Sequence, residues 1–83
     1  MKLTVRYFAS IRESVGLGSE TLETASGDLA GLRDELVARG EPYAQALARG
    51  KAVRVALDQV MSDESAGLKE GCEVAFFPPV TGG

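Results

Sequence analysis

Residues 72–83 join a strand-like pattern to a segment rich in proline and glycine: Cys72-Glu73-Val74-Ala75-Phe76-Phe77-Pro78-Pro79-Val80-Thr81-Gly82-Gly83. Cys72, Val74 and Phe76 alternate with the residues between them, which is the period of a strand with one buried face. Pro78 has no backbone N–H to donate to a sheet and therefore ends the strand. We expect a last strand through Phe77, followed by an extended tail over residues 78–83.

The beginning of the chain carries the same strand period. Leu3, Val5 and Tyr7 alternate with polar residues and predict a half-buried first strand. Residues 10–15 suit a short helical turn, and the glycines of residues 16–19 indicate a turn into a weaker second strand over residues 20–24. The first and second strands should pair as a hairpin-like unit.

The middle of the chain predicts helix. Asp28 is suited to cap a helix whose apolar residues recur every three or four positions, and Gly40 is suited to end it. The apolar positions are Leu29, Leu32, Leu36 and Val37. Pro42 fits the first turn of a second, short helix in which Tyr43 and Leu47 share a face, and we expect this helix to end at Gly50.

Residues 53–57 alternate again and predict a third strand, followed by a turn at Asp58-Gln59 and a short apolar step at Val60-Met61. The order of elements predicts an α+β fold, with a mixed sheet of about five strands and the helices on one face. If the first and last strands lie side by side, the tail projects from one end of the sheet. We therefore expect a domain over residues 1–77 and a tail over residues 78–83.

Composition excludes several classes of function. The 83 residues carry a net charge of −3, which argues against binding to a phosphate backbone. No apolar run is long enough to cross a bilayer. The single cysteine, Cys72, and the absence of histidine exclude the usual thiolate and imidazole metal sites. The lone cysteine and the absence of a signal-peptide pattern favour a reducing cytoplasm.

The tail is the strongest candidate for chemistry. Two prolines favour a polyproline II path of about 3.1 Å per residue, so residues 78–83 have a reach of roughly 18 Å. Gly82 and Gly83 have no Cβ and fit a narrow channel in a partner. A carboxylate on Gly83 becomes an electrophile when ATP adenylates it, and sulfur can then replace the adenylate. A frayed terminus is the other interpretation that the residues leave open.

Two segments of the chain resemble a known family. Residues 68–83, from Leu68-Lys69-Glu70-Gly71 through the Phe-Phe-Pro-Pro-Val-Thr-Gly-Gly ending, are similar to the small, sulfur-carrying subunit of molybdopterin synthase. The segment Tyr7-Phe8-Ala9-Ser10-Ile11-Arg12-Glu13-Ser14-Val15-Gly16 also resembles the beginning of that family. The resemblance implies a ubiquitin-like β-grasp fold.

The resemblance also implies a reaction. An ATP-dependent activating enzyme adenylates the terminal glycine, Gly83, which becomes a thiocarboxylate and donates sulfur to cyclic pyranopterin monophosphate in molybdenum cofactor biosynthesis. Pro78, Pro79, Val80, Thr81 and Gly82 would form the segment that inserts into the large subunit. The family implies a heterotetramer with two large subunits that hold the catalytic residues. This chain would be a sulfur donor rather than an enzyme, with no permanently bound cofactor.

Five further positions have individual expectations. Phe77 and Phe8 fall in the outer phase of the last and first strands, which predicts a docking patch for a partner. Cys72 shares its phase with core residues and is expected to be a buried, unreactive thiol. The acidic residues Asp63 and Glu64 are expected to belong to a solvated loop.

Alternatives remain open at this point. A related carrier for thiamine or transfer-RNA thiolation would use the same thiocarboxylate chemistry. A ubiquitin-like protein modifier would instead attach Gly83 to lysine side chains. A plain interaction module would leave the tail unused.

Overall fold

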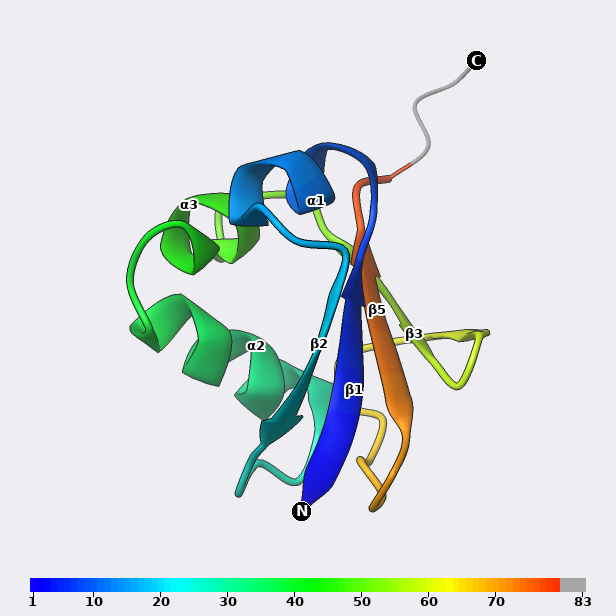
Figure 1. The fold of residues 1–83 in the computed structure, drawn as a ribbon. Helices are drawn as coiled ribbons and strands as arrows, with labels where there is room; N and C mark the ends of the chain where they lie inside the picture. The colour runs from blue at the N-terminus through cyan, green and yellow to red at the C-terminus, as the bar shows by residue number, and fades with distance from the viewer. Residues whose placement is uncertain (80–83) are drawn as a thin grey trace.

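A mixed five-stranded sheet, in the order β2-β1-β5-β3-β4, lies at the centre of the computed structural model, which describes residues 1–79 (Figure 1). The strands are β1 (Lys2–Tyr7), β2 (Ser19–Glu23), β3 (Arg54–Leu57), β4 (Val60–Ser62) and β5 (Glu73–Phe77). β1 and β5 are parallel, and the other neighbouring pairs are antiparallel. The predicted α+β class, the mixed sheet and the adjacency of the first and last strands are confirmed.

Three helices cover one face of this sheet: α1 (Ala9–Val15), α2 (Leu29–Ala38) and α3 (Tyr43–Leu47) (Figure 1). The capping prediction for α2 is confirmed, because the Asp28 carboxylate accepts a hydrogen bond from the Gly31 N–H at 2.8 Å. Gly40 follows the helix with a φ of +89°, a conformation that glycine adopts without strain.

The prediction that the second short helix runs to Gly50 is wrong. α3 ends at Leu47, and Ala48 is extended with φ −53° and ψ 148°. The carbonyls of Leu47 and Ala48 accept hydrogen bonds from the Arg33 side chain. This side chain therefore satisfies the end of the helix in place of a further helical turn.

The core lies between the helices and the inner face of the sheet. Its strand residues are those that the alternation predicts, including Leu3, Val5 and Tyr7, and the leucines of α2 are fully buried against them. The rings of Tyr7 and Phe76 are stacked with centroids 6.3 Å apart, so the two parallel central strands are also joined through their side chains. None of the helices over residues 1–79 is long and apolar enough to cross a membrane.

Candidate functional site

The root of the tail lies in the centre of the sheet. β5 pairs with β1 on one side and with β3 on the other, where Phe77 lies opposite Arg54. The pairing of β5 with β1 continues one residue beyond β1, because the Phe8 N–H donates to the Phe76 carbonyl at 3.1 Å. Pro78 and Pro79 follow and are half-buried. The segment that leads into the tail therefore starts from a strand held on both sides.

The two predicted docking aromatics lie together on the face of the sheet opposite the helices. The rings of Phe8 and Phe77 meet edge to face, with centroids 6.4 Å apart. Phe8 is 38% exposed, and Phe77 is half-buried. The structure thus places both rings where the strand phase predicts, although a docking role for them remains a prediction.

These rings border a shallow hollow of about 510 Å³ on the outer face. Its floor is formed by Ala56 and Ala75, which are cross-strand partners on β3 and β5 and are only 7% and 8% exposed. Because both floor residues are alanines, the taller side chains around them leave space above the sheet. The remaining lining residues are Arg6, Phe8, Gln59, Met61, Glu73 and Phe77.

The chemistry of the hollow suits an apolar side chain of a partner protein. Met61 is 54% exposed at its edge, and the neighbouring Val60 is 65% exposed. Arg6 lies 5.2 Å from the centre of the Phe8 ring and 4.0 Å from the Glu73 carboxylate, which places charges at one rim. Apolar centres with polar rims are typical of protein interfaces.

The other predicted residues fall into two groups. Cys72 is buried and belongs to the core cluster, as predicted, although it precedes β5 rather than starting it. Val80, Thr81, Gly82 and Gly83 lie outside the described residues. Over residues 1–79, no group of three or more His, Cys, Asp or Glu side chains is placed to hold a metal ion.

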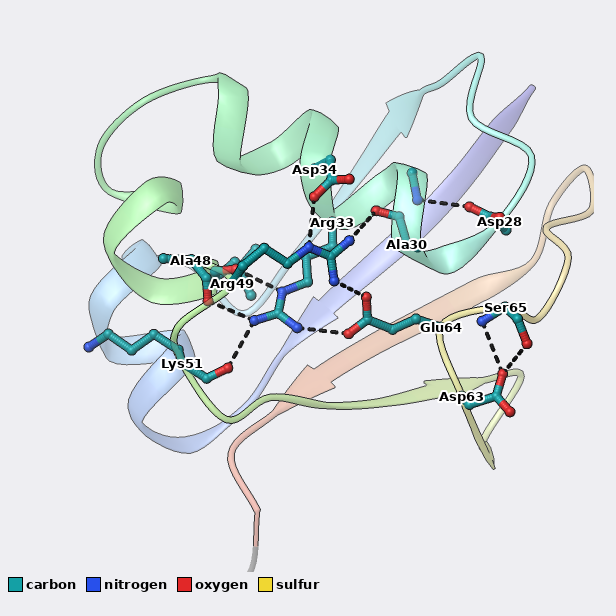
Figure 2. A network of polar contacts seen from close by, with 12 residues as sticks. Asp28, Ala30, Arg33, Asp34, Ala48, Arg49, Lys51, Asp63, Glu64 and Ser65 are labelled. Carbon is teal, nitrogen blue, oxygen red and sulfur yellow. Dashed lines mark hydrogen bonds and ion pairs between the residues drawn. The ribbon is translucent and has the colours of Figure 1, made fainter.

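One expectation about the acidic loop is wrong. Asp63 does form a local turn, in which its carboxylate accepts from the Ser65 N–H at 3.0 Å. Glu64, however, binds the buried Arg33 at 2.7 Å and also binds Arg49 (Figure 2). Burial by itself would raise the pKa of Glu64, but hydrogen bonds from the two arginines lower it below its ordinary value.

The sequence did carry a signal for this ion-pair network. Arg33 lies four residues after Leu29 and one after Leu32, so it falls within the apolar side of α2 and is only 4% exposed. A charge at such a position requires buried partners. The identity of those partners depends on segments far away in the chain, which the helical pattern does not specify.

A second polar cluster joins the edge of the sheet to the helices. The Glu20 carboxylate of β2 accepts hydrogen bonds from the hydroxyls of Tyr7 and Tyr43, at 2.9 and 2.7 Å, and pairs with Arg39 at 3.2 Å. Burial raises the pKa of Tyr7, and its hydrogen bond to Glu20 raises it further. Burial would also raise the pKa of Glu20, but its three hydrogen bonds lower it.

A model described as the ThiS family matches residues 5–83. The molybdopterin synthase sulfur carrier subunits of Haemophilus influenzae and Escherichia coli are 40% and 37% identical to the chain over 81 residues. Each match covers 98% of this chain and 99% of the relative. Small archaeal modifier protein 3 of Haloferax volcanii is 33% identical over 97 residues and is matched over its full length.

Among solved structures, the protein-protein complex of subunits 1 and 2 of molybdopterin-converting factor from Helicobacter pylori contains a similar chain. It superposes with a TM-score of 0.70 and 28% identity, over 100% of both chains. The β-grasp prediction is therefore confirmed. The chain belongs to the ThiS family and has the ubiquitin-like β-grasp fold.

Proposed function

We propose that this chain is the sulfur carrier subunit of a molybdopterin synthase and that Gly83 carries the sulfur. The full-length match to two sulfur carrier subunits is the observation that carries this proposal. The family match extends through Gly82 and Gly83, so the glycine pair lies within the shared sequence. The placement of the tail root at the end of a central strand also supports the proposal.

The proposed chemistry takes place at the α-carboxylate of Gly83. An ATP-dependent activating enzyme transfers AMP to this carboxylate and releases pyrophosphate. A sulfur nucleophile then displaces AMP, and a thiocarboxylate remains. The thiocarboxylate sulfur attacks an electrophilic carbon of cyclic pyranopterin monophosphate in the partner's site and displaces an oxygen leaving group, which joins Gly83 to the pterin as a thioester. Water then hydrolyses the thioester, so the pterin keeps the sulfur and the carrier returns to a carboxylate.

The chain acts as the donor, and the catalytic residues belong to the partner. The hollow bordered by Phe8 and Phe77 is proposed to dock the large subunit. The tail, residues 78–83, is proposed to enter the partner's active site as an extended segment separate from the domain of residues 1–77. The complex of subunits 1 and 2 from Helicobacter pylori supports a large-subunit partner, and we propose the same pairing here, as a heterotetramer.

A protein modifier is the second candidate, because the chain is 33% identical to small archaeal modifier protein 3. In that case the activated Gly83 would form isopeptide bonds with lysine side chains. The shared fold does not separate the two functions, because one fold can serve both. The first chemical step does not separate them either, since both functions begin with adenylation of the same glycine.

The intact mass of the protein purified from its native host, with fragmentation of its C-terminus, tests the proposal. We expect a fraction in which one oxygen of Gly83 is replaced by sulfur, and this fraction should increase after incubation with the activating enzyme, ATP and a sulfur source. A variant with one alanine added after Gly83 is the control and should gain no sulfur. Lysine conjugates that depend on Gly83, without any thiocarboxylate, would favour the modifier instead.

A further inference from the structure

A buried arginine ties the segment between α3 and β3 to α2. The Arg33 Nε donates to the Leu47 carbonyl at 2.7 Å, and its Nη2 donates to the carbonyls of Ala48 and Lys51 at 2.7 and 3.0 Å (Figure 2). One side chain thus binds the carbonyl of Leu47, the last residue of α3, and two carbonyls of residues 48–51, which belong to no helix or strand. The planar guanidinium fixes its partners in direction as well as in distance.

Two further contacts lie beside the three carbonyl bonds. The Arg33 Nη1 donates to Glu64 at 2.7 Å, which neutralises the buried charge. Arg49, which lies in the same segment, reaches back to Asp34 at 2.9 Å and to Glu64 (Figure 2). Residues 47–51 are therefore fastened to α2 from the buried side by Arg33 and from the solvent side by Arg49.

The end of the segment that Arg33 holds lines a cavity next to Pro78, where the tail begins. Pro78 lines a small cavity of about 170 Å³ together with Lys51 and Ala52 and with Ser10 and Ile11 of α1. Pro78 thus shares this cavity with α1 and with the end of the segment that Arg33 holds. A shift of residues 51–52 would change the space through which Pro78 passes.

A change at Pro78 also changes the direction of Pro79. The ring of each proline restricts its φ, so a change in the angle of the chain at Pro78 is retained at Pro79. The hollow bordered by Phe8 and Phe77 is lined by residues other than Arg33 and residues 47–51.

We propose that Arg33 is a positioning residue, which holds residues 47–51 and thereby sets the direction in which the tail leaves the sheet. This proposal rests on the sulfur carrier function, because that function requires the tail to enter the partner's site while the hollow is docked. A reacting group misplaced by about 1 Å loses up to roughly a hundredfold in rate.

Three variants of the full-length chain test the proposal. Arg33→Met keeps much of the side-chain volume and removes every donor. Glu64→Gln is the matched variant, because it removes the charge opposite Arg33 but leaves the three carbonyl bonds. Glu35→Gln is the stability control on the same helix, where Glu35 accepts hydrogen bonds from Thr24 and Ser26.

Two measurements are made on each variant. The first is the set of nuclear Overhauser contacts between Pro78 and Ala52 in the isolated protein, with Tyr7 to Phe76 contacts as the test of an intact core. The second is steady-state sulfur transfer from thiocarboxylated protein to the large subunit. For Arg33→Met we expect loss of the Pro78 to Ala52 contacts, kcat reduced about tenfold and an unchanged KM. Glu64→Gln and Glu35→Gln should retain both the contacts and the kcat.

The proposal is overturned if Arg33→Met retains the Pro78 contacts and the wild-type kcat. It is also overturned if Glu35→Gln, at equal thermal stability, loses as much kcat as Arg33→Met, because the effect would then be one of stability alone. Failure of the sulfur carrier function is distinguishable from both outcomes. In that case the wild-type protein itself transfers no sulfur, whatever the contacts at Pro78.

Discussion

Phe8 and Phe77 lie edge to face on the outer side of the sheet, with their ring planes at 87° and their centroids 6.4 Å apart. Phe8 directly follows β1, and Phe77 is the last residue of β5 before Pro78. The aromatic pair therefore borders the hollow on the outer face of the sheet and also marks the root of the tail. A partner that covers this pair would be brought next to the residues that lead to Gly83.

Truncation of the aromatic pair should weaken binding of the large subunit. We expect Phe77→Ala to cost about 2 kcal/mol or more of binding free energy, because central aromatic anchors dominate many interfaces, and Phe8→Ala to cost less. Isothermal titration calorimetry with the large subunit measures this. Leu17→Ala removes an exposed apolar side chain outside the hollow and should bind as the wild type does. Equal losses for Phe77→Ala and Leu17→Ala would contradict the assignment.

Filling the hollow should block docking without disturbing the fold. Ala75 forms part of its floor, so the longer side chain of Ala75→Leu would extend into the open space above the sheet. We expect binding to the large subunit to weaken at least tenfold, about 1.4 kcal/mol, with little change in the unfolding temperature. Unimpaired binding by a folded Ala75→Leu protein would show that the partner does not use the hollow.

The buried ion pair should contribute far more to stability than its exposed neighbour. Glu64→Ala leaves the guanidinium of Arg33 without its acidic partner in a buried position, which costs about 3 kcal/mol of unfolding free energy. Arg49→Ala removes a side chain that is 48% exposed and should cost about 1 kcal/mol or less. Urea denaturation of both variants measures the difference. Similar losses would mean that Arg33 finds other partners when Glu64 is absent.

Glu20 should contribute to unfolding at acid pH. Its pKa in the folded protein is lowered from the ordinary 4.5, so its stabilising contribution is complete above pH 4.5 and is lost as the pH falls through the lower folded value. We expect Glu20→Gln to lower the unfolding temperature at pH 7. Between pH 5 and about 3, the unfolding temperature of this variant should fall less than that of the wild type.

Glu13→Gln removes the same charge from an exposed position on α1 and serves as the control for the pH experiment. The control should follow the wild-type pH dependence. If Glu20→Gln and the wild type lose the same amount of stability between pH 5 and about 3, the hydrogen bonds to Glu20 do not account for the acid dependence.

The parts of the fold that depend on local pattern could be predicted from the sequence. Alternation placed Val5 and Phe76 in the core, and the carboxylate of Asp28 identified the beginning of α2. Strand phase also placed Phe8 and Phe77 on one face, because successive side chains of a strand point to opposite sides. The end of α3 was misplaced, since the Arg33 side chain satisfies its last carbonyls from another helix.

By itself, the sequence determined the order of strands and helices and the resemblance of its two ends to a sulfur carrier, because these depend on neighbours in the chain. The same resemblance leads to the prediction that Gly83 carries the sulfur. Only the tertiary structure decided that Ala56 and Ala75 form the floor of a hollow and that Glu64 lies against Arg33. Both results depend on contacts between residues far apart in the chain. Such contacts are set by the pairing of strands and the packing of α2, which no local period of the sequence specifies.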